Sequence, residues 1–136
     1  MAAQQTGPTD DGTRDEAVDP ALVELAQQML DWARGGDTER VLAYVDAGAP
    51  ADLTGADGNT LLMLAAYHGH AALVRGLAER GADVDRLNDR GQSPLAGAVF
   101  KGEDDVVSTL LALGADLDHG APTARATAEM FGRSLT

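Results

Sequence analysis

The chain has 136 residues, which is enough for one domain, and its 44% hydrophobic and 24% charged composition is ordinary for a globular protein. Its net charge of −12 at pH 7 argues against nucleic acids and anionic membranes as partners, because both require a basic surface. The absence of cysteine excludes a disulfide framework, a thiol nucleophile and a cysteine-based metal site. No apolar run approaches the roughly 18 residues of a membrane span, and the N-terminus lacks a signal-peptide core, so we expect a cytoplasmic protein.

Residues 1–18 are polar and acidic, with no apolar period. Such a composition cannot bury enough apolar surface to fold, so it predicts a disordered N-terminal tail. We interpret this tail as a solvating segment rather than a binding motif.

A helix is predicted from Asp19 and Pro20, because aspartate accepts from free backbone N–H groups and proline fits the first helical position. Gly36 predicts its end, and a second helix follows over residues 39–47. Trp32, on the first helix, is expected to be mostly buried. We interpret residues 19–54 as an N-terminal capping repeat whose polar face ends the apolar stack; that face carries Glu24, Gln27, Gln28 and Asp31.

The stretch 58–85 recurs at 91–118 with a step of 33 residues. A fixed period of this size predicts stacked helix pairs joined by loops. The same step reaches back to a degenerate first copy, and residues near Thr123 and Gly132 repeat the pattern about three positions early. The predicted units are therefore 55–87, 88–120 and a partial C-terminal repeat over 121–136.

Two hexapeptides carry a family resemblance: Thr60-Leu61-Leu62-Met63-Leu64-Ala65 and Ser93-Pro94-Leu95-Ala96-Gly97-Ala98. With Gly69-His70 and the two Gly-Ala-Asp segments, they resemble the ankyrin repeat and its T-P-L-H-x-A signature, whose histidine is replaced here by Met63 and Ala96. The resemblance implies an all-α ankyrin repeat solenoid of stacked antiparallel helix pairs joined by β-hairpin-like loops.

No catalytic or metal-binding pattern stands out from this repeat. His68 and His70 are two residues apart, which does not place them on one helix face. Asp83 and Asp85 recur one repeat later as Asp116 and Asp118, which indicates loop residues rather than an acid–base pair. We therefore expect no catalysis, no metal and no cofactor.

One row of residues favours binding. Arg34, Tyr67 and Phe100 are 33 residues apart, and the resemblance implies that this position faces a concave groove together with the loop tips. Tyrosine and arginine are frequent in binding hot spots, although the two rings could instead cover the edges of the core. The predicted partner-binding residues are Arg34, Asp57, Asn59, Tyr67, His68, Leu87, Asp89, Arg90, Gln92, Phe100 and Lys101.

The leading functional hypothesis is a monomeric, non-catalytic module that binds another protein through this groove and the loop tips. An alternative is an acidic inhibitor or immunity-type regulator that masks a basic protein, which predicts binding that weakens sharply with salt. A weaker alternative is an enzyme or a small-molecule binder, which predicts a deep pocket with shifted titrations.

Overall fold

A computed structural model describes residues 19–135; the tail predicted over 1–18 lies outside the described residues. The described chain folds into helices without an extended β-sheet. Their bounds are α1 Pro20–Gly35, α2 Thr38–Asp46, α3 Leu61–Tyr67, α4 Ala71–Glu79, α5 Pro94–Lys101, α6 Asp104–Ala112 and α7 Ala124–Met130. The predicted all-α class is confirmed, and the bounds of α1 and α2 agree with those predicted from the sequence to within about one residue. The division into repeat units remains a prediction.

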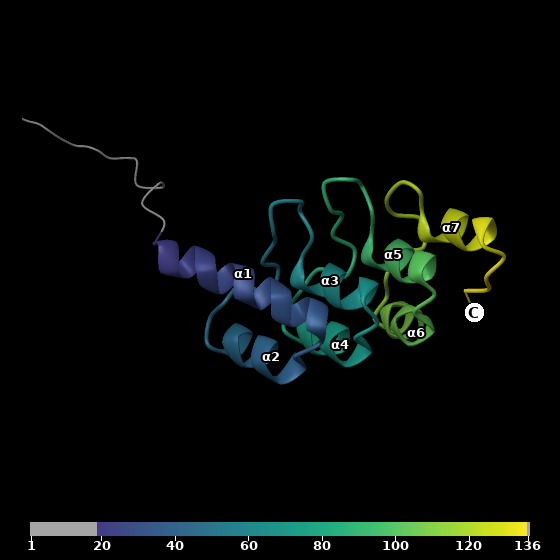
Figure 1. The fold of residues 1–136 in the computed structure, drawn as a ribbon. Coiled ribbons are helices and arrows are strands. Elements are labelled where there is room, and N and C mark those ends of the chain that lie inside the picture. The colour runs from purple at the N-terminus through teal and green to yellow at the C-terminus, as the bar shows by residue number, and fades with distance from the viewer. Residues whose placement is uncertain (1–18, 136) are drawn as a thin grey trace, which may run out of the picture.

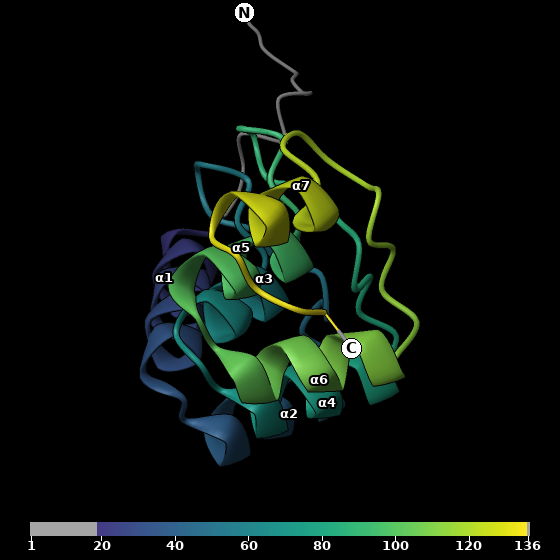
Figure 2. The ribbon, with the colours of Figure 1, turned by 90° about the vertical axis from the view of Figure 1, so that its right-hand side faces the viewer.

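The helices form two rows, as Figure 1 shows. The inner row contains α1, α3, α5 and α7, each packed on the next, and the outer row contains α2, α4 and α6. The connecting loops project beyond the inner row on one side of the stack. The view along the stack in Figure 2 shows that the chain after α7 runs back towards α6. Leu135, in this last segment, is partly buried against the core.

Equivalent residues begin the inner helices. The side-chain oxygens of Thr60 and Ser93 accept from the backbone N–H groups three residues on, at 2.9 and 3.1 Å, and Thr123 does the same at 3.0 Å. Asp19 likewise accepts from the backbone of Ala21 at 2.9 Å, as the sequence predicted. Such caps satisfy donors that a helix leaves free, so each inner helix starts at a fixed place in the repeat.

Small residues allow the inner helices to approach one another. Ala65 and Ala98 are fully buried, and Ala128 on α7 is nearly so. Leu62 on α3 and Leu95 on α5 are also fully buried. Trp32 is partly buried at the α1–α2 contact, with its ring centroid 5.2 Å from that of Tyr44. It packs at the edge of the stack, so it is less enclosed than the alanine and leucine positions.

The loops are simpler than full β-hairpins. In the described chain the isolated bridge between Thr54 and Thr60 is the β-pairing of the first loop, and the next loop closes with a hydrogen bond of 3.0 Å from Asn88 N to Gln92 O. The physical reason is that hydrogen bonds to side chains take the place of the backbone hydrogen bonds that would pair two strands. Asp57 and Asn88 accept from backbone N–H groups inside their own loops, which are tight turns rather than paired strands.

Candidate functional site

A hollow of about 320 Å³ lies between the inner helices α3 and α5 and the two loops that precede them. Its floor comes from the helices and its rim from the loop tips. Five of the predicted binding residues line it, namely Asn59, Tyr67, Arg90, Gln92 and Phe100, together with Met63, Leu64 and Asn88. We call this hollow and its margins the groove.

The two rings of the groove occupy equivalent places near the ends of successive inner helices. Tyr67 is the last residue of α3 and is partly buried. Phe100 lies in the last turn of α5 with 50% of its surface exposed, and it meets Phe131 edge-to-face at 5.6 Å. A half-exposed ring of this size can gain further burial from a partner, which a core residue cannot. Half of the Phe100 surface is thus open to contact by a partner.

A cation and a histidine lie beside Tyr67. The Lys101 Nζ atom is 4.7 Å from the centre of the Tyr67 ring, and the His68 ring meets the same ring edge-on at 5.5 Å. Partial burial lowers the pKa of His68 below its ordinary value, and the neighbouring charge of Lys101 acts in the same direction. His68 is therefore expected to be neutral at pH 7.

Asn88 organises the rim of the groove. Its buried side-chain oxygen accepts from the backbone N–H groups of Arg90 and Gln92 at 2.9 and 3.0 Å. Its amide donates to the side-chain oxygens of Asn59 at 2.8 Å and of Gln92 at 3.0 Å. The bond to Asn59 ties the two loops together, and the other three bonds hold Asn88, Arg90 and Gln92 within their own loop. Sequence reasoning did not select Asn88, and its place just before the Asp-Arg-Gly turn was the available signal.

Six of the predicted residues are not part of the hollow's lining. His68 and Lys101 lie beside Tyr67, and the other four lie elsewhere. Arg34 is paired with Asp31 on its own helix, and Leu87 packs near Gly120 of the following loop. Asp89 packs its carboxylate against Gly58. Asp57 accepts from both the backbone and the side chain of Asn59, and the backbone bond is the main reason that the pKa of Asp57 is lowered. The structure therefore concentrates the candidate site on α3, α5 and the rim, and the binding role of all eleven residues remains a prediction.

A second, smaller hollow of about 200 Å³ continues from Phe100 towards α7. It adds Met130 and Phe131, which are 69% and 45% exposed, to the apolar surface. The sequence reading missed both residues because the last repeat is shifted by about three positions. When that shift is applied, Met130 falls on the position of Tyr67 and Phe100.

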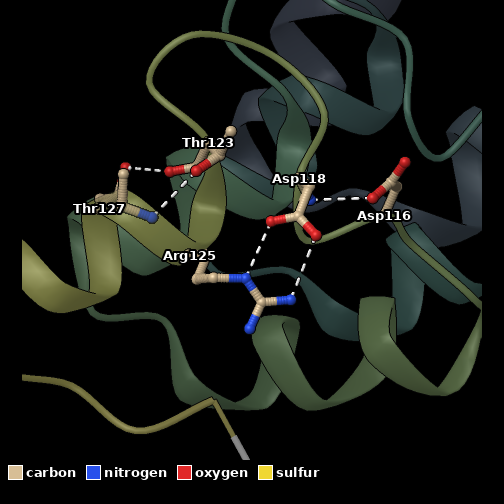
Figure 3. Close-up of polar contacts among 6 residues, drawn as sticks. Asp116, Asp118, Thr123, Arg125 and Thr127 are labelled. Atoms are coloured by element: carbon tan, nitrogen blue, oxygen red, sulfur yellow. Dashed lines mark hydrogen bonds and ion pairs between the residues drawn. The ribbon is translucent and has the colours of Figure 1, made fainter.

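The aspartates of the loops link successive repeats. The side chain of Asp52 accepts from the backbone N–H of Asp83 at 2.9 Å, and Asp85 accepts in the same way from Asp116 at 2.8 Å. This recurrence supports the interpretation of these acids as loop residues. Figure 3 shows the end of the series, where Asp118 is held by Arg125 through two hydrogen bonds of 2.9 and 3.2 Å. Those bonds lower the pKa of Asp118 and raise that of Arg125.

Residues 19–135 contain neither a candidate metal site nor a candidate membrane span. No group of three or more histidine and acidic side chains is placed to hold a metal ion in this part of the chain. None of its helices combines the length and the apolar character that a membrane span requires.

The comparisons with known proteins agree with the architecture. A family model described as ankyrin repeats, in three copies, matches residues 29–121, which is more than half of the chain. A Pseudomonas aeruginosa protein described as an ankyrin repeat protein is 42% identical over 58 residues, which cover 43% of this chain and 34% of the relative. The matched part thus spans about a third of the length of that curated relative. From the helix-pair stack and the family match together, the chain belongs to the ankyrin repeat family.

Proposed function

We propose that this protein binds a partner protein through the groove, without catalysis or a cofactor and as a monomer. Ankyrin repeats generally serve protein–protein interaction, and the family match therefore favours this class of function. The observation that carries the proposal is the half-exposed Phe100 at the margin of a hollow shared with Tyr67. An exposed aromatic ring above a hollow offers a partner both apolar area and a place to insert a side chain.

A second candidate is an acidic regulator that masks a basic protein, and the net charge of −12 favours it. Such a surface attracts a basic partner over long distances, and salt screens that attraction. Recovery of the partner that falls steeply between low and high salt would support this candidate over recognition by the groove alone.

The test is affinity capture from an extract of the source organism with the full chain as bait. The first variant is Phe100→Ala, combined in a second bait with Tyr67→Ala. Val23→Ala is the control, because Val23 is also an exposed hydrophobic side chain, at 48%, but lies on α1 and lines neither the groove nor the hollow between α1 and α2. We expect proteins captured by the wild type and by the control to be lost with Phe100→Ala, while circular dichroism and the melting temperature change little.

Two results would contradict the proposal. If Phe100→Ala unfolds the protein, the ring serves the core. If it folds and still captures the same proteins, the partner uses another face. The strongest competing face is an apolar hollow of about 430 Å³ between α1 and α2, beside the exposed Leu22. Leu22→Glu would then abolish the capture.

A further inference from the structure

Among the residues that line the hollow, Arg90 is the one charged side chain. A second cation lies at the margin, where the Lys101 Nζ atom lies over the Tyr67 ring. Neither side chain has an ion-pair partner within residues 19–135. Four other arginines of the described chain are paired with aspartates: Arg34, Arg40, Arg80 and Arg125. The cations at the groove are therefore available to a partner, although acids outnumber bases in the chain by 22 to 10.

The carboxylates of the loops lie outside the lining of the hollow. Asp57 accepts from the backbone and the side chain of Asn59, and Asp85 accepts from the backbone of Asp116. Asp83 accepts from the backbone of Asp85 in the same loop. Both oxygens of Asp57, but only one oxygen each of Asp83 and Asp85, take part in these bonds. Within the hollow itself, no carboxylate competes for Arg90.

Both cations adjoin the apolar part of the groove, because Arg90 lines the same hollow and Lys101 lies over one of its rings. The floor consists of Met63 and Leu64, which are buried, and the rings of Tyr67 and Phe100 flank it. The volume of about 320 Å³ is at the lower end of ligand pockets, which is room for one or two side chains rather than for a larger molecule. An extended segment that crosses this groove would present one apolar side chain to the floor and its neighbours to the cations.

Resting on the proposed function, we propose that the groove takes an extended acidic segment of the partner. An aromatic or large aliphatic side chain of that segment enters the hollow beside Phe100, and flanking aspartate or glutamate residues meet Arg90 and Lys101. The guanidinium of Arg90 can hold a carboxylate through two parallel hydrogen bonds, whereas Lys101 acts as a point charge. At physiological salt the screening length is about 8 Å, so these contacts act locally while the distant acids of the protein are largely screened.

The test is selection of a phage-displayed library of random 12-residue peptides on the full chain. We expect the enriched peptides to carry Asp or Glu next to an aromatic or large aliphatic residue. One enriched peptide, synthesised with a fluorescein label, is then titrated by fluorescence polarisation. Arg90→Glu together with Lys101→Glu is expected to weaken its binding about tenfold, because each change removes an attraction and adds a repulsion of similar size.

The matched control is Arg75→Glu with Arg86→Glu. Both side chains are exposed and lack an ion pair in the described chain, and neither lines the groove, so the change of net charge is the same. We expect the control to keep the affinity within about twofold, since distant charges are screened. If the Lys101 substitution lowers the melting temperature, Arg90→Glu alone is used, with an expected loss of about threefold.

The outcomes separate this inference from the proposed function. Enrichment of basic peptides whose binding is lost with Phe100→Ala overturns the acidic segment but leaves the groove as a binding site. Peptides that still bind Phe100→Ala overturn both, because they bind elsewhere. A library that yields no enriched peptide, or an equal loss of affinity in the control, also overturns the acidic segment.

Discussion

Two glycines inside helices provide a sharp test of how closely the helices pack. A methyl group added at Gly76 in α4 would lie 2.5 Å from Leu42 Cδ1, and 3.2 and 3.3 Å from Leu42 Cδ2 and Cγ. Rotation of the end of Leu42 does not clear this contact, because the Cγ atom is also close. A methyl group at Gly97 in α5 would meet Met63 Cε at 3.1 Å and Tyr67 Cδ1 at 3.4 Å. Methionine is flexible, so Met63 can move by the few tenths of an ångström required.

The two substitutions to alanine are expected to change the free energy of unfolding in opposite directions. Alanine in place of glycine in a helix interior favours the folded state by about 0.5–1 kcal/mol. Overpacking a filled site costs about 1–3 kcal/mol. At Gly76 the cost of overpacking exceeds the gain in helix preference, so we expect the free energy of unfolding to fall by about 1 kcal/mol and the melting temperature by about 4 °C. At Gly97 the helix preference is larger, so we expect a gain of about 0.5 kcal/mol.

The assay is thermal and guanidinium unfolding of the two variants and the wild type, followed by far-UV circular dichroism. Leu42→Ala is then combined with Gly76→Ala, because the smaller side chain makes room for the new methyl group. We expect the double variant to lose less free energy of unfolding than the sum of the two single losses. A stabilised Gly76→Ala protein, or strictly additive losses, would refute the close α2–α4 contact.

Two further predictions concern the core and the end of the loop series. Leu62→Ala is expected to lower the free energy of unfolding by about 2–5 kcal/mol, because the side chain is fully buried. Leu22→Ala, at a 61% exposed position, is expected to change it by less than about 0.5 kcal/mol. Urea unfolding measures both variants, and equal losses would contradict the assigned core. The pKa of Asp118 is lowered by Arg125, so their contact stabilises the fold above the ordinary Asp pKa of 3.8 and the contribution is lost as the pH falls through the lowered value. Arg125→Ala should therefore be less stable than the wild type at pH 7 and equally stable in strong acid, and a difference that is independent of pH would show that the pair contributes nothing through its charges.

Much of the fold could be predicted from the sequence because the same helix-capping and helix-ending residues occur in both central repeats. Thr60 and Ser93 cap equivalent helices, and glycines such as Gly102 end them in the left-handed conformation. The form of the loops could not be predicted in the same way. It depends on side-chain bonds such as those of Asn88, which join two repeats and follow no local periodicity.

The location of the candidate site could be predicted from the sequence more fully than its charges. Tyr67 and Phe100 could be placed on one surface because they share a repeat position. Arg34 shares that position too, but its i, i+3 neighbour Asp31 pairs with it, which the period of 33 does not reveal. The net charge indicated a basic partner, whereas the hollow itself is lined by Arg90 and by no carboxylate, which the composition does not reveal.

The carboxylates that link successive loops also bear on the entropy of association. Because Asp52 holds the amide of Asp83 and Asp85 holds that of Asp116, the loops are tied to one another before any partner arrives. Ordering a free residue costs about 1–2 kcal/mol of conformational entropy, and a floppy rim would subtract that amount from the binding free energy for each residue it fixed. In the proposed complex these tied loops would lose little conformational entropy, and the partner's segment would bear most of the ordering cost.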